Sequence, residues 1–557
     1  TPQDRKTFSA EELRSGWCLA CRNEVAPDMV VAVPASSLFG TEHQILSETV
    51  SAAQGEVCAA VRKEYVELEE PSLTDDAADV LRLEQRIGAF KIDLPLIRHL
   101  SAGLRRNRFK GTAVLADGRL IDFESGDTSD SCYGVAFDLG TTTLVGELLD
   151  LRDGRSLGVV SRMNPQVSFG DDVLARIRHA AGGAGALEEM RAAVSLELAA
   201  MIESLCQMAG VRRGHVYETS LAGNTTMEHI LCGLDPAQLG SIPFVPQHAR
   251  GLLVPAIELG LPMHHGARAY VMPLIGGFVG GDTVAGMLAT GMDELNEPAL
   301  LVDIGTNGEI VLLHNDTLYA ASTAAGPAFE GARISSGMRG THGAIEKVLF
   351  NDDVKLEVIG NTEPVGLCGS GLIDLVAELL RYGIVTSTGQ LLPPEELPPG
   401  LSPQLAARVC RDDAGVTRFV LMPENGVRGE VSLTQRDVRE LQLGCGAIRA
   451  GIQMLLREAG IEATDLGRVL VAGGFGNYIR RDSARRIGLL PGGTAPDRIR
   501  YVGNVALAGA RMALLSKKMR LRGEAMARRT RHVELSTLDG FQEAFADAMS
   551  FPENEGW

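Results

Sequence analysis

The sequence predicts an α/β protein with two similar lobes, because one strand–turn–strand pattern occurs twice. The first copy is Gly134-Val-Ala-Phe-Asp138-Leu-Gly140-Thr141-Thr142-Thr143, in which a mostly apolar stretch leads into an acid, a glycine and hydroxyls. The second copy is Leu300-Leu-Val-Asp303-Ile-Gly305-Thr306-Asn307-Gly308. A third stretch, Val469-Leu-Val-Ala-Gly473-Gly474-Phe475-Gly476-Asn477, is an apolar strand that ends in a glycine pair.

Both turns have the composition of a phosphate-binding loop. Glycine lets backbone N–H groups approach a ligand closely, successive amides form an anion nest, and threonine hydroxyls add donors. Asp138 and Asp303 end the first strand of each copy, where they are placed to hold Mg²⁺ through water. Residues without side chains, Gly473 and Gly474, would let the backbone lie flat against a purine. A single Asp-x-Gly hairpin is common, so the order and spacing of all three signals carry the prediction of ATP–Mg²⁺ binding.

In this order the three signals resemble those of the actin, sugar-kinase and large heat-shock-chaperone ATPase superfamily. The resemblance implies a two-lobed actin/sugar-kinase-like ATPase, with the first lobe over residues 131–299 and the second over 300–557, C-terminal extension included. In the second lobe, Gly326 and Glu330 lie in a loop-to-helix stretch that could contact ribose and adenine.

One further acid is a candidate for the chemistry. Asp282 follows a glycine-rich stretch at the start of a helix, where it could orient the attacking water or act as the helix N-cap. Because no other strong general base stands out, we expect slow turnover. His229 lies on a helix after the polar turn at Asn224, and we interpret it as a packed histidine rather than a ligand.

The amino-acid composition limits the kinds of partner that this protein can bind and the compartment in which we expect it. The 557 residues carry a net charge of −18, which argues against nucleic acid or an anionic membrane as a partner. No apolar run reaches the roughly 18 residues that span a bilayer, and no signal peptide is visible. Nine cysteines, mostly scattered, indicate a reducing cytoplasm. We therefore expect a cytoplasmic protein that binds neither nucleic acid nor membrane.

The segments before the first lobe divide into three. Residues 1–34 hold Cys18 and Cys21 and look like the end of a plant-type ferredoxin domain, whose fourth cluster cysteine arrives alone on a late strand. Cys21 matches that position, but one thiolate cannot hold a [2Fe–2S] cluster, so we expect the cluster only in a longer chain. A linker over 35–59 and a small α/β middle domain over 60–130 follow, the latter with a hairpin at Asp117-Gly118 and no catalytic constellation.

Further motifs extend the resemblance to one family, the ATP-dependent reductive activators of corrinoid enzymes. They are Phe137–Thr143, Ala222–His229, Val302–Glu309, Ala324–Gly331, Ala472–Asn477 and Val502–Val505. Two departures stand out: the iron–sulfur loop is absent, and Gly444-Cys445 replaces the Ala-Lys that the family usually has, which puts a basic contact in doubt.

The resemblance implies that the protein returns the Co(II) form of a corrinoid protein in a methyltransferase system to Co(I). Electrons would come through the [2Fe–2S] domain from a donor that the sequence does not identify. ATP would change the conformation of the lobes. A homodimer is compatible with this mechanism. Asp138 and Asp303 would hold Mg²⁺. The phosphate contacts would come from Gly140, Thr141, Thr142, Thr143, Gly305, Thr306 and Asn307, and the base contacts from Gly473, Gly474, Phe475 and Asn477. Two other classes stay open: a metabolite kinase, and an ATP-gated binding protein without turnover.

Overall fold

The structure is a computed structural model that describes residues 57–412, 414–424, 429–473 and 479–553. These residues form two compact units, each described separately below. Among the described residues, the larger unit takes in 57–330 together with 387–389 and 440 onward, and the smaller takes in 331–386 and 390–439. Cys18 and Cys21, and with them the expected ferredoxin remnant, lie outside the described residues, as do Gly474, Phe475 and Asn477.

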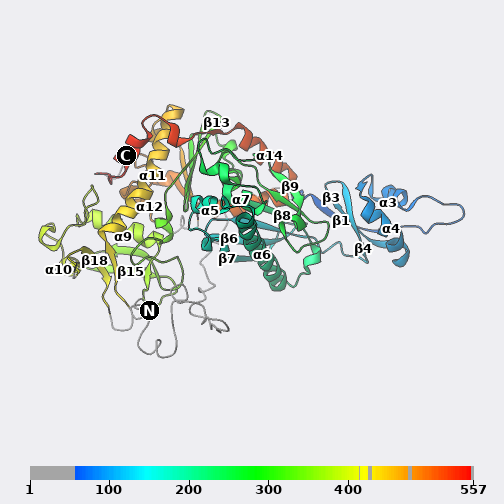
Figure 1. Ribbon diagram of the computed structural model, residues 1–557, viewed down its shortest axis with the longest axis horizontal. Helices are drawn as coiled ribbons and strands as arrows, with labels where there is room; N and C mark the ends of the chain where they lie inside the picture. The colour runs from blue at the N-terminus through cyan, green and yellow to red at the C-terminus, as the bar shows by residue number, and fades with distance from the viewer. Residues whose placement is uncertain (1–56, 413, 425–428, 474–478, 554–557) are drawn as a thin grey trace, which may run out of the picture. The chain divides into compact units, whose positions relative to one another are not determined.

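The larger unit begins with a small α/β domain (Figure 1). Its sheet has the order β1-β3-β4-β2, with β1 Val61–Glu67, β2 Lys91–Ile92, β3 Lys110–Ala116 and β4 Arg119–Ser125. The helices are α3 Asp79–Ile87 and α4 Leu94–Arg106. Asp117 and Gly118 have φ values of 49° and 72° and connect β3 to β4, which confirms the predicted hairpin.

The first lobe is built on a six-stranded sheet of order β7-β6-β5-β8-β10-β9. Its strands are β5 Tyr133–Leu139, β6 Thr143–Asp150, β7 Ser156–Met163, β8 Val216–Gly223, β9 Leu252–Pro255 and β10 Arg268–Val271. Its helices are α5 Val173–Ala180, α6 Ala184–Ala209, α7 Thr225–Leu231 and α8 Gly281–Thr290. The central strand β5 pairs antiparallel with β6 and parallel with β8, so its carboxyl end and that of β8 meet at one edge of the sheet.

The helix α6 is the one helix within the described ranges that is long and apolar enough to cross a membrane by length and composition. It packs on β6 and β7, and its residues Met190, Leu198, Met201 and Leu205 are buried in the core of the first lobe. Packing against the sheet therefore accounts for its apolar composition.

The second lobe repeats the arrangement of five of the first lobe's six strands, and its sixth strand is added at the opposite edge of the sheet. Its sheet has the order β21-β20-β11-β12-β13-β22, with β11 Ala299–Ile304, β12 Gly308–His314, β13 Thr317–Thr323, β20 Arg468–Ala472, β21 Ile499–Gly503 and β22 Arg531–His532. The helices are α11 Gln435–Ala459, which continues from the smaller unit, α12 Arg481–Arg486, α13 Val505–Leu515, α14 Lys517–Arg529 and α15 Phe541–Ala548. As in the first lobe, the central strand β11 pairs antiparallel with the next strand and parallel with a later one, so the predicted repeat is confirmed.

The two lobes share one hydrophobic core. Buried residues of both sheets, among them Tyr217 and Leu301, belong to the same cluster. The helices α8 and α13 cross within it at very close range. A Cβ atom at Gly509 would lie 2.1 Å from the carbonyl oxygen of Ala285, so only glycine lets the two backbones approach this closely.

The smaller unit contains two three-stranded sheets, of order β15-β14-β16 and β17-β18-β19. The strands are β14 Ala344–Phe350, β15 Val354–Val358, β16 Gly366–Leu367, β17 Val409–Arg411, β18 Thr417–Met422 and β19 Val431–Thr434. Helices α9 Gly369–Arg381 and α10 Pro403–Ala407 accompany them.

Candidate functional site

The turn between β5 and β6 is tight and is held by two hydrogen bonds from Asn164. A Cβ atom at Gly140 would lie 2.4 Å from the carbonyl oxygen of Thr143, so the turn requires glycine. The side chain of Asn164 donates to the carbonyl of Gly140 at 2.9 Å, and its backbone amide donates to the carbonyl of Thr142 at 2.9 Å. The backbone of the first predicted phosphate loop is therefore held in place by Asn164, a residue outside the loop.

Thr141 is held by two residues to which the sequence analysis gave no role. The amide nitrogen of Asn224 donates to Oγ1 of Thr141 at 2.9 Å, and Nη2 of Arg176 donates to its carbonyl oxygen at 2.6 Å. Arg176 is fully buried, and this desolvation lowers its pKa to about 10. Sequence reasoning missed Arg176 because an arginine in the first turns of a helix usually lies on the surface.

The second turn, between β11 and β12, contacts the end of β20. The amide of Gly305 donates to the carbonyl of Asn307 at 3.0 Å, and the hydroxyl of Thr306 donates to Glu330. Gly473 has a φ of 102°, and a Cβ atom there would lie 2.4 Å from the carbonyl oxygen of Ile304. The structure thus brings Gly473 and Glu330 to the second turn.

Five carboxylates converge at these two turns: Asp138, Glu228, Asp282, Asp303 and Glu309. Desolvation raises the pKa of Asp138 and of Asp303 to about 7, with repulsion from Asp282 adding to the effect on both. Desolvation also raises the pKa of Asp282 to about 6, and it raises the pKa values of Glu228 and Glu309 well above the ordinary value. Asp138, Asp282 and Asp303 are each partly exposed.

Asn504, in the second lobe, forms a hydrogen bond with the carboxylate of Asp138 in the first lobe. Its Nδ2 donates to Oδ2 of Asp138 at 2.8 Å, and its Oδ1 accepts the amide hydrogen of Leu507 at 2.9 Å, which makes it the N-cap of α13. The sequence did contain a signal, because Gly503-Asn504 before an apolar helix is a typical N-cap pattern. The sequence alone did not predict a role for Asn504.

Two expectations about the first lobe are settled by local contacts. The N-cap of α8 is Gly280, and Asp282 lies in the first turn, where its carboxylate accepts the amide hydrogen of Thr283 at 2.7 Å. The capping interpretation of Asp282 is therefore wrong. His229 is fully buried, with Nδ1 donating to the carbonyl of Thr225 at 2.7 Å and Nε2 accepting the amide of Gln247 at 3.0 Å, so it is a packed histidine as predicted.

The cluster has the chemistry of a site for a hard divalent cation. Neither lysine nor arginine is among the charges that shift the pKa values of these five carboxylates in the described part of the chain. In addition, Oε2 of Glu228 is buried and has no hydrogen-bond partner among the described residues. Carboxylate oxygens that lack a balancing positive charge are the donors that Mg²⁺ prefers.

The departure at Gly444-Cys445 has a packing explanation. A Cβ atom at Gly444 would lie 2.9 Å from the carbonyl oxygen of Ala325, so the glycine lets α11 approach that loop. Cys445 is buried, and burial raises the pKa of its thiol. It therefore behaves as a small apolar residue and supplies no basic contact.

The repeated sheets and paired turns define a two-lobed ATPase fold of the actin and sugar-kinase class. Family models agree along nearly the whole chain: the RACo linker region matches residues 50–130, the RACo middle region matches 133–295, and the C-terminal domain of RACo, the ASKHA domain, matches 297–556.

Comparisons with individual proteins indicate the same family. The corrinoid activation enzyme RamQ of Eubacterium limosum is 37% identical over 498 residues, which cover 88% of this chain and 82% of that protein. The Co(II) methylated amine-specific corrinoid protein reductase of Methanosarcina barkeri is 29% identical over 69% of this chain and 70% of that protein. A solved structure of a reductive activator for corrinoid, iron–sulfur protein matches with a TM-score of 0.81 and 34% identity, over 98% of this chain and 89% of that one. This chain belongs to the RACo family, whose relatives here are activators and reductases of corrinoid proteins.

Proposed function

We propose that this protein uses ATP to return a corrinoid protein from the inactive Co(II) state to Co(I). The observation that carries the proposal is the convergence of Asp138, Asp282 and Asp303 at two phosphate-type turns, in a chain whose relatives act on corrinoid proteins. The reduction takes up one electron, for which we propose a [2Fe–2S] domain as the immediate donor, with Cys21 as one cluster ligand in a longer chain.

We assign the residues of the site the roles that the sequence predicts for them. Asp138 and Asp303 are proposed to hold Mg²⁺ through water. Phosphate contacts are assigned to Gly140, Thr141, Thr142, Thr143, Gly305, Thr306 and Asn307, and nucleoside contacts to Gly326, Glu330, Gly473, Gly474, Phe475 and Asn477. Bound Mg²⁺ would neutralise charge that develops on the transferred phosphoryl group.

Asp282 is the candidate for positioning the attacking water. Its pKa of about 6 leaves the carboxylate ionised at neutral pH, so it can accept a hydrogen bond from water.

ATP can drive an uphill electron transfer only if it binds one conformation of the protein more tightly than another. The crossing of α8 and α13 and the contact from Asn504 to Asp138 connect the lobes at the site itself. We therefore propose that nucleotide binding changes the lobe arrangement and, through it, the affinity for the corrinoid partner of a methyltransferase system. A homodimer and a reducing, cytoplasmic environment are part of the same proposal.

The test is to measure ATP hydrolysis with and without the Co(II) form of a candidate corrinoid protein, and to record Co(I) absorbance when a low-potential electron donor is added. We expect the Co(II) form, but not the methylated form, to change the rate of ADP release. A phosphorylated small alcohol or acid as product would instead establish a metabolite kinase. Tight ATP and partner binding without ADP formation would establish an ATP-gated binding protein.

A further inference from the structure

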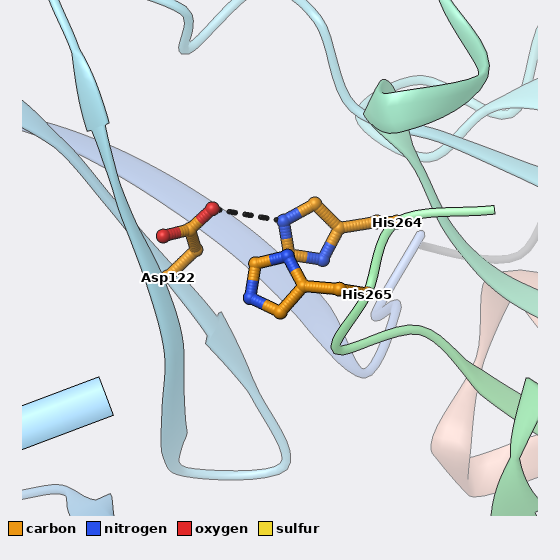
Figure 2. A group of neighbouring side chains, drawn as sticks. All are labelled: Asp122, His264 and His265. Atoms are coloured by element: carbon orange, nitrogen blue, oxygen red, sulfur yellow. Dashed lines mark hydrogen bonds and ion pairs between the residues drawn. The ribbon is translucent and has the colours of Figure 1, made fainter. Parts of the chain in front are cut away.

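A second cluster of ligating side chains lies where the small α/β domain meets the first lobe (Figure 2). Asp122 lies on β4, and His264 and His265 lie in the loop before β10. One ligating atom from each of the three side chains lies within 4.8 Å of the other two. Figure 2 shows the two imidazole rings side by side, with the Asp122 carboxylate opposite them.

Backbone contacts orient Asp122 and His264 toward each other. Oδ1 of Asp122 accepts the amide hydrogen of Phe123 at 2.7 Å, and Nδ1 of His264 accepts that of Gly266 at 3.0 Å. The remaining atoms, Oδ2 of Asp122 and Nε2 of His264, lie 3.0 Å apart. His264 is buried, so the orientation of its ring is fixed by its surroundings.

His265 supplies a third donor on the solvent side. Its side chain is exposed and makes no hydrogen bond within the described residues, and its ring centroid lies 4.2 Å from that of His264. Its ring nitrogens are therefore available to bind a metal ion.

The nearby Glu124 does not belong to this donor set. Its Oε2 accepts from Nζ of Lys63 at 2.7 Å and from the hydroxyl of Thr128, and its Oε1 accepts from the hydroxyl of Tyr217. Both oxygens are thus engaged within a separate network, which also balances the charge of Lys63. The donor set is two imidazole nitrogens and one carboxylate oxygen.

We propose that Asp122, His264 and His265 bind a divalent cation of the Zn²⁺ class, with water as the remaining ligand. Two imidazoles and one carboxylate suit Zn²⁺ better than Mg²⁺ or Ca²⁺, which prefer oxygen ligands. Because the Gly266 amide engages Nδ1, the neutral ring of His264 carries its proton on Nε2. Metal binding through Nε2 requires that this proton move to Nδ1, which the Gly266 amide must release, so the turn at 264–267 has to rearrange.

The site would join the small domain to the first lobe. Asp122 comes from the small domain and both histidines come from the lobe, so a bound ion replaces one hydrogen bond by three coordinate bonds across the contact. A cation that binds only the native arrangement stabilises it by mass action.

In the experiment, chelator-treated protein is titrated with Zn²⁺ and no other transition metal. Excess Mg²⁺ is present so that the carboxylates of the nucleotide site are occupied and do not compete for Zn²⁺. We expect one Zn²⁺ per chain at this site, at least about tenfold weaker binding in His265→Gln and in Asp122→Asn, and unchanged binding in His99→Gln, an exposed histidine of α4. Co²⁺ bound in place of Zn²⁺ should give a visible ligand-field absorption that His265→Gln loses.

His265 is exposed, so its replacement by glutamine leaves the fold intact, which a matching thermal melt in the absence of metal verifies. Zn²⁺ should raise the melting temperature of the wild type and of His99→Gln, but not that of His265→Gln. Binding of equal strength in the wild type and His265→Gln, or no Zn²⁺ binding at all, overturns the proposal and leaves the Asp122–His264 hydrogen bond as a contact between domains. Because no nucleotide is used, this outcome is independent of the proposed ATPase activity.

Discussion

Asp138 and Asp303 are the two residues on which the proposed nucleotide site depends most directly. Replacing either by alanine removes a carboxylate that would hold Mg²⁺ against the phosphates. We expect ATP hydrolysis to fall at least about 100-fold, since a catalytic metal is worth several kcal/mol. Rate measurements in excess ATP–Mg²⁺ check this, with Asp497→Ala, an exposed acid, as the matched control. Wild-type rates in both Asp138→Ala and Asp303→Ala would contradict the site assignment.

The raised pKa of Asp303 predicts how stability depends on pH without Mg²⁺. The folded-state value is about 7, against an ordinary 3.8, so the native state holds the proton more tightly than the unfolded chain. The associated stabilisation is complete below the unfolded-state pKa and is lost as the pH rises through about 7. Ionised Asp303 is thus destabilising at pH 8, where Asp303→Asn should be the more stable protein.

We expect Asp303→Asn to gain about 1–3 kcal/mol at pH 8, because each pKa unit is worth about 1.4 kcal/mol and partial exposure screens the charge. Urea titrations at pH 8 and pH 5 in chelator measure the difference, which should shrink at pH 5. Added Mg²⁺ should reverse the order by stabilising the wild type. A variant that is less stable than the wild type at pH 8 in chelator would show that the carboxylates do not repel one another as described.

At the residue scale, the sequence predicted the acids of the repeated turns but not the residues around them. Asp138 and Asp303 stand in a motif that occurs twice, so their positions at the two turns follow from local order. Arg176 and Asn504 act through contacts with residues far away in sequence, and no local pattern specifies those contacts. Glu228 lay within a quoted motif, yet only the fold places its carboxylate near Asp282.

At the scale of elements, the crossing of α8 and α13 holds the two lobes together. A methyl group at Gly509 would lie 2.1 Å from the backbone oxygen and 2.5 Å from Cα of Ala285, so a helix must move to accept it. We expect Gly509→Ala to lose about 1–3 kcal/mol of stability, measured as a lower melting temperature. Gly103→Ala is the control, because nothing lies within 4 Å of its added Cβ and the helix propensity of alanine should give up to about 1 kcal/mol. Equal melting of Gly509→Ala and the wild type would rule out the close crossing.

The N-terminus of α13 offers a way to separate the cap from the contact to Asp138. Asn504→Asp keeps an oxygen that accepts from the Leu507 amide, but it removes the donor to Asp138 and adds a charge to the cluster. A hydrogen bond to a charged group is worth about 1.5–3 kcal/mol, so hydrolysis should fall about 10- to 100-fold while helix stability is kept. Asn504→Ala should lose the contact as well as about 0.5–2 kcal/mol of capping energy. If Asn504→Asp hydrolyses ATP at the wild-type rate, the hydrogen bond to Asp138 does not contribute to hydrolysis, and Asn504 serves only as the N-cap of α13.

The elements that the sequence predicted best are those with strong local patterns. The Asp117-Gly118 hairpin and the two repeated hairpins combine apolar strands with glycine turns, and all three form. The small sheets within 331–439 were not anticipated, because several of their strands are only two to four residues long and carry too few side chains for a period to be read. The parallel pairing of β11 with β20 joins strands far apart in sequence, and no local pattern specifies it.

At the scale of the whole molecule, both lobes contribute carboxylates to one cluster and side chains to one core. Any ligand that prefers one arrangement of the lobes must therefore act on residues of both. If ATP changes the affinity for a corrinoid partner, the partner changes the affinity for ATP by the same factor, because the two binding equilibria share one thermodynamic cycle. We expect a coupling free energy of about 1–3 kcal/mol, or roughly 5- to 150-fold in affinity.

Four dissociation constants measure this coupling: ATP with and without a Co(II) corrinoid protein, and that protein with and without ATP. Reciprocity requires the two ratios to agree, which guards against nonspecific association. In Asp303→Ala, where ATP binding is weakened, the partner's affinity should no longer respond to the same ATP concentration, while Asp497→Ala should behave as the wild type. If the partner binds with the same affinity whether or not ATP is bound, the nucleotide does not select a lobe arrangement that the partner recognises, and the energy of ATP must reach the cobalt by another route or not at all.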